Sequence, residues 1–165
     1  MTYPNMVDLS STGGCPKKYI EKIYNIYLDE VVNGYPKLHF LGSELRHTFN
    51  PMSFGKGFGF WHCVSEEGET KAEDDRIIDL ERCKRISWIR YAILNIQEDG
   101  QGEVIWWRVK RGQKQRIVLF ITSENYAVVL EDRNQYVLLW TTYLVKPNRS
   151  RKFHKEHKEY WESMP

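Results

Sequence analysis

The sequence predicts a single α+β domain in which helices precede an antiparallel sheet and a basic helix follows it. The chain of 165 residues suits one hydrophobic core. Apolar residues recur every three or four positions in residues 16–32 and 79–97, and then change to a period of two after residue 103. We therefore expect helices packed on a four- to five-stranded antiparallel sheet. Residues 1–16 are predicted to form a flexible arm and residues 17–165 the single domain.

The first half of the chain shows one clear helix and several weaker elements. Residues 1–16 mix Ser, Thr, Gly and Pro without periodicity, which is typical of a loose arm. One apolar face runs from Pro16 to Val32, so we expect a helix that Asn33 and Gly34 end. The expected elements after it are a strand at Leu38–Leu41, a loop at Gly42–Gly57, a strand at Phe58–Ser65 and an exposed acidic loop at Glu66–Asp75.

The second half has stronger patterns. An apolar stripe from Cys83 to Ile96 predicts a helix over Asp79–Gln97. Strands with short polar turns follow at 104–109, 116–122, 126–133 and 136–145. Such short connections require antiparallel neighbours, and the last strand is apolar on both faces, which favours a central or doubly covered position. Arg149–Trp161 is expected to form the terminal basic helix.

Composition narrows the possible classes of protein. With 41% hydrophobic and 28% charged residues, the chain is neither a disordered tail nor a collagen-like fibre. No apolar run approaches the roughly 20 residues of a membrane span, and the first residues lack a secretory pattern. Three cysteines without a CxxC pair indicate neither a disulfide framework nor a thiolate zinc site. We therefore expect a cytoplasmic protein that does not bind a membrane.

Basic charge is concentrated in the second half of the chain. Residues 1–75 hold 7 Lys and Arg against 11 Asp and Glu, whereas residues 76–165 hold 17 against 11. Aromatic residues are interleaved with these cations, a combination that suits phosphates and unstacked bases. The alternative is that aromatic strands build the core while their charged neighbours are solvated. These aromatic residues are Trp88, Trp106, Trp107, Tyr126, Trp140 and Tyr143.

His62 is the first candidate for chemistry. It lies in the apolar segment FGFWHCVSEE, where an imidazole is out of keeping with its neighbours. An ordinary pKa near 6.5 makes histidine a natural general acid or base at neutral pH. The alternative is a hydrogen-bonded structural histidine.

The segment DLERCKRISWIR, Asp79 to Arg90, is the second candidate. Ion pairs of Asp79 with Arg82 and of Glu81 with Arg85 explain much of its pattern on a helix. Its basic residues outnumber these acids, however, and the arginine fork grips phosphate oxygens bidentately. The segment therefore predicts either a solvated, salt-bridged helix or a phosphate-binding one.

Two further pairs of residues carry hydroxyl or imidazole groups. Thr141 and Tyr143 are two apart on the last strand, so they share one sheet face and could position a phosphate or a ribose hydroxyl. An ordinary β-surface is the alternative. His154 and His157 have the spacing of a metal pair, but no third ligand is near in the sequence, which favours a solvated basic helix. Because no nucleotide-loop or metal-hydrolase motif is present, we expect no cofactor and no metal.

These segments, taken in order, resemble a known group of nucleases. The matching stretches are FWHCVSEE, RIIDLERCKRISWIR, EVIWW, YAVVLEDR, LLWTTYLV and KFHKEHKEYW. From about Phe58 to Trp161 the chain resembles the phage-associated nuclease-like families of the barnase, EndoU, colicin and RelE (BECR) superfamily, which are small α+β domains. It departs from the family pattern at Thr142, where a smaller Ala is expected, and the part before Phe58 matches nothing in it.

The resemblance implies a toxin or mobile-element endoribonuclease that needs no metal. In this reaction a ribose 2′-hydroxyl attacks its own 3′-phosphate and leaves a 2′,3′-cyclic end. The family pattern assigns acid–base chemistry to His62, phosphate binding to Arg82 or Arg85, and phosphate positioning to Thr141 and Tyr143.

The resemblance also implies partners. RNA, either tRNA or ribosome-associated mRNA, is the expected substrate, and an antitoxin or immunity protein is the expected inhibitor. A non-catalytic nucleic-acid-binding or interaction module on the same fold is the alternative function, and a metal-dependent hydrolase that uses His154 and His157 is a third. The residues expected to contact the substrate are Asp79, Trp88, Arg90, Trp107 and Lys152.

Overall fold

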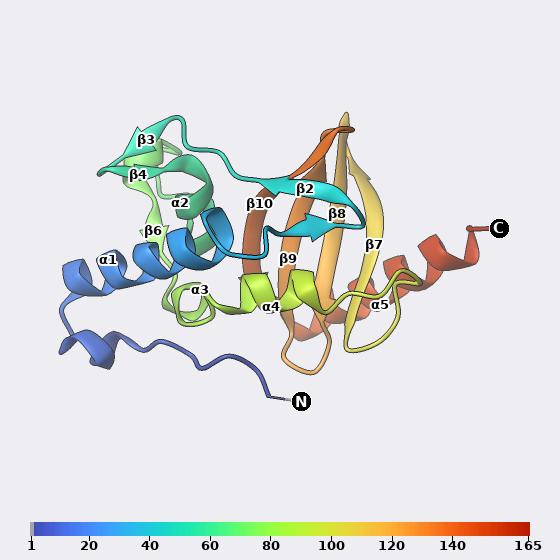
Figure 1. Ribbon diagram of the computed structural model, residues 1–165, viewed down its shortest axis with the longest axis horizontal. Helices are drawn as coiled ribbons and strands as arrows, with labels where there is room; N and C mark the ends of the chain where they lie inside the picture. Colours follow the sequence, from blue (N-terminus) through green and yellow to red (C-terminus); the bar gives the residue numbers. More distant parts are fainter. Residues whose placement is uncertain (1) are drawn as a thin grey trace.

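The computed structural model describes residues 2–165, and within them the chain is an α+β fold with a curled, mixed six-stranded sheet (Figure 1). The strands of this sheet are β1 (His39–Phe40), β2 (Ser43–Arg46), β7 (Val104–Arg111), β8 (Lys114–Ile121), β9 (Tyr126–Asp132) and β10 (Tyr136–Leu144). Two small hairpins pair β3 (Met52–Ser53) with β4 (Lys56–Gly57) and β5 (Ser65–Glu66) with β6 (Ile77–Ile78). The helices are α1 (Pro16–Tyr27), α2 (Phe58–Val64), α3 (Leu80–Lys84), α4 (Trp88–Leu94) and α5 (Pro147–Glu162), with shorter turns η1 (Leu9–Thr12), η2 (Leu28–Val32) and η3 (Glu73–Asp75).

Strands β7 to β10 form the antiparallel meander that the period-two pattern predicts. Each strand places apolar side chains on both faces, because both faces meet other parts of the protein. In β10, Val137 and Leu139 are buried on one side and Leu138 on the other. β10 lies inside the sheet between β9 and β2, which confirms the central position expected from its two apolar faces.

The sheet is not wholly antiparallel, which corrects the predicted four- to five-stranded antiparallel sheet. β2 pairs with β10 in parallel, with Tyr136 opposite Glu44 and Leu138 opposite Arg46. β2 lies within the loop expected at Gly42–Gly57. It escapes prediction because Leu45 is its buried residue and its other side chains are polar or charged. Such a short strand gives too little alternation to be recognised.

Phe58–Ser65 is another correction, because Phe58–Val64 forms helix α2 rather than a strand. Five of its seven residues are buried, so the segment is apolar nearly all round and has no helical period to detect. A short apolar run of this kind does not distinguish a buried helix from a buried strand. His62 therefore lies on a helix.

The helix predicted over Asp79–Gln97 is interrupted between α3 and α4. Arg85 caps α3 with φ −101° and ψ 22°, and the chain turns before α4 begins at Trp88. Because Cys83, Ile86 and Ile89 all remain buried through this turn, the apolar stripe continues and conceals the break. The helices predicted near the two ends of the chain are confirmed as α1 with η2 and as α5.

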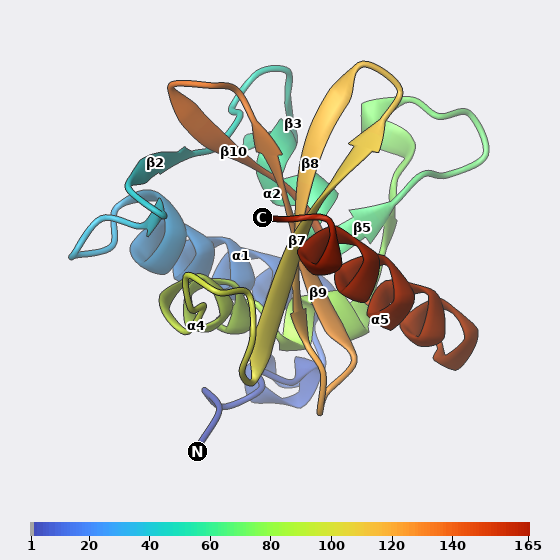
Figure 2. The same cartoon turned by 90° about the vertical axis from the view of Figure 1, so that its right-hand side faces the viewer.

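Each face of the sheet packs against helices. Helices α1 to α4 share a large core with one face, while α5 packs across part of the opposite face (Figure 2). Phe153 of α5 is fully buried there, with its ring 5.1 Å from that of Trp107 and 5.4 Å from that of Phe120. The part of this face beyond α5 carries Arg116, Glu131 and Trp140, and we refer to it below as the polar face.

The segment expected to be a flexible arm contacts the helices in its described part, residues 2–16. The Tyr3 ring stacks on Trp88 at a centroid distance of 5.1 Å, and the Val7 amide donates to the Lys84 carbonyl at 3.0 Å. The Trp88 indole in turn donates to the Pro4 carbonyl at 2.8 Å. These contacts attach the arm to α3 and α4.

Across residues 2–165, no helix combines the length and apolar character needed to cross a bilayer. Cys15, Cys63 and Cys83 are all free thiols. Burial raises the pKa of both Cys63 and Cys83 to about 12. Both thiols are therefore protonated at neutral pH and act as small core side chains.

Candidate active site

The imidazole of His62 lies at the end of α2, beside β10. Its ring stacks on Phe58 at 3.9 Å between centroids and lies 6.0 Å from the ring of Trp140. Nε2 is 3.3 Å from both carboxylate oxygens of Glu73. Within residues 2–165, Nδ1 forms no hydrogen bond. If Nε2 carries the proton and donates to Glu73, Nδ1 is left as a proton acceptor.

The surroundings of His62 lower its pKa below the ordinary 6.5. Burial is the main cause and the Arg76 charge adds to it, while the hydrogen bond and charge of Glu73 act in the opposite direction. The net effect favours the neutral imidazole at neutral pH. This is the protonation state that a general base requires.

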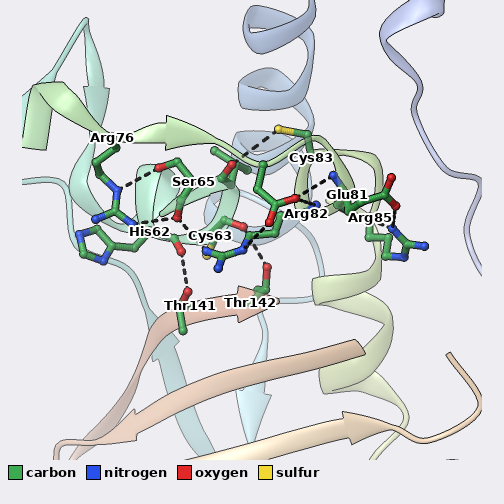
Figure 3. A network of polar contacts seen from close by, with 12 residues as sticks. His62, Cys63, Ser65, Arg76, Glu81, Arg82, Cys83, Arg85, Thr141 and Thr142 are labelled. Carbon is green, nitrogen blue, oxygen red and sulfur yellow. Dashed lines mark hydrogen bonds and ion pairs between the residues drawn. The ribbon is translucent and has the colours of Figure 1, made fainter. Parts of the chain in front are cut away.

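Two threonines of β10 fix the end of α2. Thr141 Oγ1 donates to the His62 carbonyl at 2.5 Å, and Thr142 Oγ1 donates to the Cys63 carbonyl at 2.9 Å (Figure 3). The last carbonyls of a helix have no partner within it, so these hydroxyls satisfy them from across the fold. Thr141 therefore positions the backbone of His62. At Thr142, where the resemblance leads to Ala, the hydroxyl has this structural bond.

Arg76 and Arg82 meet at the backbone of Ser65 (Figure 3). The Ser65 carbonyl accepts from Arg76 Nη2 at 2.8 Å and from Arg82 Nη1 at 2.7 Å. Arg76 Nε also donates to the Ser65 hydroxyl at 2.9 Å, and Arg82 Nε is 3.3 Å from a carboxylate oxygen of Asp79. The two guanidinium groups thus brace the turn that follows α2.

Arg85 lies at the other end of the network in Figure 3, away from His62. Its Nη1 donates to the Glu81 carbonyl at 2.9 Å and to the Glu81 carboxylate at 2.8 Å. The guanidinium also lies 5.3 Å from the ring centre of Trp88. The structure therefore places Arg82 near the end of α2 and leaves Arg85 in an intrahelical pair.

Tyr143 borders a small cavity on the polar face. This cavity, of about 130 Å³, is lined by Arg111 of β7, Arg116 of β8 and Arg149 of α5, together with Trp140 and Thr141. We call it the arginine hollow. Burial raises the pKa of Tyr143, although Arg149 acts against this, so the phenol is protonated at neutral pH. A cavity with several guanidinium groups and a phenol donor suits a phosphate.

Arg116 is held in this hollow by a buried carboxylate. Glu131, directly opposite on β9, has a side chain only 1% exposed. Arg116 Nε lies 2.8 Å from Glu131 and Arg133 Nε lies 2.5 Å from it, so the buried charge is paired. The Arg116 guanidinium also lies 4.3 Å from the ring centre of Trp140. Arg116 is therefore a fixed cation between Glu131 and the indole.

Arg111, Arg116 and Arg149 are not among the site residues predicted from the sequence. They come from three elements, and each follows an ordinary polar pattern within its own segment. The sequence does carry a signal for Arg116 and Glu131. Each is a charged residue on a strand face whose other residues, spaced two apart, are apolar. Their opposite charges on adjacent strands predict a pair once the meander is recognised.

The two tryptophans expected to contact RNA are buried in the core. Trp88 is 2% exposed and Trp107 is 0% exposed. The Trp107 indole donates to the Glu156 carboxylate at 3.3 Å, which attaches β7 to α5. Neither ring is accessible to stack on a base, so the aromatic pattern at these positions is that of a core.

Arg90 and Asp79 also have structural partners. Arg90 donates to the carbonyls of Glu30 and Pro36 at 2.9 and 2.8 Å. The Asp79 carboxylate accepts from the Glu81 and Arg82 amides and caps α3. Asp79, Arg82 and Tyr143 also share the wall of an open hollow of about 560 Å³. Lys152, in contrast, is exposed on α5.

The pair His154 and His157 does not form a metal centre. His157 Nε2 lies 2.9 Å from the Gly100 carbonyl, and His154 is exposed with its ring 5.8 Å from that of Phe120. Among residues 2–165, no three His, Cys, Asp or Glu side chains are grouped as a metal would require. His157 thus helps to hold α5 on the turn before β7.

Comparison with protein-family models, with curated proteins and with solved structures finds no match to this chain.

Proposed function

We propose that this protein is a metal-independent endoribonuclease that cleaves RNA by attack of a 2′-hydroxyl and leaves 2′,3′-cyclic phosphate ends. One observation carries the proposal, namely that His62 and the arginine hollow meet at Trp140. The Trp140 ring lies 6.0 Å from the His62 ring and 4.3 Å from the Arg116 guanidinium, and Trp140 and Thr141 both line the hollow. His62 and the arginine hollow are therefore both next to the Trp140 indole.

The reaction follows from these groups. His62 Nδ1 takes the proton of the 2′-hydroxyl, and the new O2′–P bond forms as the P–O5′ bond breaks. The leaving 5′ oxygen takes up a proton from water, and the hydroxide formed removes the proton from His62, which returns the imidazole to its neutral form. Negative charge grows on the phosphoryl oxygens, where Arg111, Arg116 and Arg149 stabilise it. The protonated phenol of Tyr143 donates to one of these oxygens. Thr141 positions the His62 backbone through its hydrogen bond to the His62 carbonyl. Arg82 holds the turn after α2 through its hydrogen bond to the Ser65 carbonyl.

The resemblance to the BECR superfamily supports the same proposal. Helices before a meander and a basic helix after it agree with the element order that the resemblance implies. On this basis we propose RNA as substrate and an antitoxin or immunity protein as partner, in a toxin or mobile-element setting.

Incubation of the purified protein with total RNA in excess EDTA tests the proposal. We expect cleavage to persist, and the 3′ ends to carry cyclic phosphates that block ligation until they are opened and removed enzymatically. Loss of cleavage in EDTA would instead support a metal-dependent hydrolase and contradict the proposal.

One observation favours the alternative, a non-catalytic RNA-binding module. Arg116 and Arg133 are already paired with Glu131, which reduces the net positive charge offered to a phosphate. For such a module, RNA stays intact in the incubation above, while binding weakens steeply as salt is raised. That result would overturn the ribonuclease proposal.

Substitution Glu73→Gln tests the role of His62 through pH. Glu73 raises the pKa of His62, so removal of its charge is expected to lower that pKa further. Because the base must be neutral, the acid limb of kcat/KM should move to lower pH. A pH–rate profile measures this shift, and Glu159→Gln, on the exposed side of α5, is the matched control. An acid limb that stays in place, or moves to higher pH, would argue against His62 as the base.

A further inference from the structure

The polar face continues along β10 beyond the arginine hollow. Tyr136 and Leu138 lie on one face of this strand, and at the β-bulge between Leu139 and Thr141 the Trp140 side chain lies on the same side as Thr141. Trp140 lines the arginine hollow, whereas Tyr136 and Leu138 line a second one of about 430 Å³. We call the second cavity the aromatic hollow. Its other walls include Arg46, His47, Phe49 and Arg133.

The aromatic hollow is joined to the candidate active site by two sets of contacts. On one side the Phe58 amide donates to the Phe49 carbonyl at 3.1 Å, and the Phe58 ring stacks on His62. On the other side Arg133 and Arg116 both pair with the buried Glu131. Residues that line the aromatic hollow are therefore linked to His62 through Phe58 and to Arg116 through Glu131.

The side chains around the aromatic hollow have the chemistry of a nucleotide site. The Arg46 guanidinium lies 4.3 Å from the ring centre of Tyr136. Phe49 is 43% exposed, and its ring lies 4.4 Å from that of His47. His47 Nε2 is buried and, within residues 2–165, lacks a hydrogen-bond partner. Rings beside cations suit a stacked base and its phosphate.

We propose that the aromatic hollow is a second nucleotide subsite, which binds the nucleotide next to the cleaved one in single-stranded RNA. This inference rests on the proposed ribonuclease function, because that function defines which nucleotide of the RNA is the cleaved one. Binding of RNA in the aromatic hollow does not itself require cleavage. Phe49 and Tyr136 supply the stacking surfaces, and Arg46 and Arg133 supply the positive charge.

The test is binding of a fluorescein-labelled octanucleotide whose 2′-hydroxyls are all methylated, so that it cannot be cleaved. Fluorescence anisotropy at one fixed salt concentration gives its Kd. We expect Phe49→Ala and Arg46→Ala each to weaken binding about tenfold. Both side chains are exposed, so both variants should keep the wild-type melting temperature.

Matched controls separate the subsite from general effects. Lys37 pairs with Glu44 as Arg46 does and is 53% exposed against 55% for Arg46, yet it does not line the hollow. Lys37→Ala therefore controls for lost charge. Phe54→Ala removes a phenylalanine that is 73% exposed on the β3–β4 hairpin. We expect both control variants to bind like the wild type.

The possible results distinguish the two proposals. If RNA is cleaved but Phe49→Ala and Arg46→Ala bind no more weakly than their controls, the subsite is wrong and the ribonuclease proposal stands. If RNA is never cleaved but the octanucleotide still depends on Phe49 and Arg46, the subsite is supported as an RNA-binding site and the ribonuclease proposal is wrong.

Discussion

Substitution of His62 by alanine is expected to slow RNA cleavage about a thousandfold, within the range that a general base contributes. The imidazole is the group that accepts the 2′-hydroxyl proton, and alanine has no atom that replaces it. The fold should survive, because the His62 carbonyl, and not its side chain, accepts the Thr141 hydrogen bond. Single-turnover cleavage of a labelled RNA measures the rate.

The control for this variant is His39→Ala, which removes an exposed imidazole from β1. We expect its cleavage rate to equal that of the wild type. Thermal unfolding of His62→Ala should show a cooperative transition, since the lost side chain contacts only the rings of Phe58 and Trp140 and pairs with Glu73 within the described residues. A folded His62→Ala protein that cleaves RNA at the wild-type rate would remove the imidazole from the mechanism.

Much of the fold could be predicted from the sequence because its longest elements have clear periods. The strands of the meander β7 to β10 are rich in β-branched and aromatic residues, and their short turns leave antiparallel pairing as the only local solution. Helix α1 has an apolar face, on which Tyr19, Ile23 and Tyr27 are buried, whereas α5 was expected from its basic character and buries Phe153. In contrast, β2 has one buried side chain and pairs in parallel with a strand about 90 residues away, which no local pattern reveals.

The candidate site was harder to predict because the fold assembles it from distant segments. His62 could be recognised as a polar residue in apolar surroundings, although its segment is a helix. The arginine hollow takes single residues from β7, β8 and α5, and only their convergence distinguishes them from solvated charges. Thr141 and Arg82, for which the resemblance implies phosphate positioning and binding, both bond to the backbone around the end of α2.

Trp107 illustrates how a pattern typical of RNA-binding surfaces can arise from core packing. An aromatic residue among cations fits either a base-stacking surface or a strand whose buried ring alternates with charged neighbours. Trp107 belongs to the second class, because its fully buried ring lies 5.1 Å from Phe153 and fixes α5 on β7. Its role is therefore expected to appear in stability and not in RNA affinity.

Substitution Trp107→Ala should lower the free energy of unfolding by about 3–5 kcal/mol, since it opens a large cavity between β7 and α5. Phe54→Ala, at an exposed tip, should change it by less than about 0.5 kcal/mol. Urea unfolding measures both values. At a temperature where both variants are folded, Trp107→Ala should bind the methylated octanucleotide like the wild type. If Trp107→Ala kept the wild-type stability but lost RNA binding, Trp107 would have to contact RNA. Its ring would then have to leave the core when RNA binds.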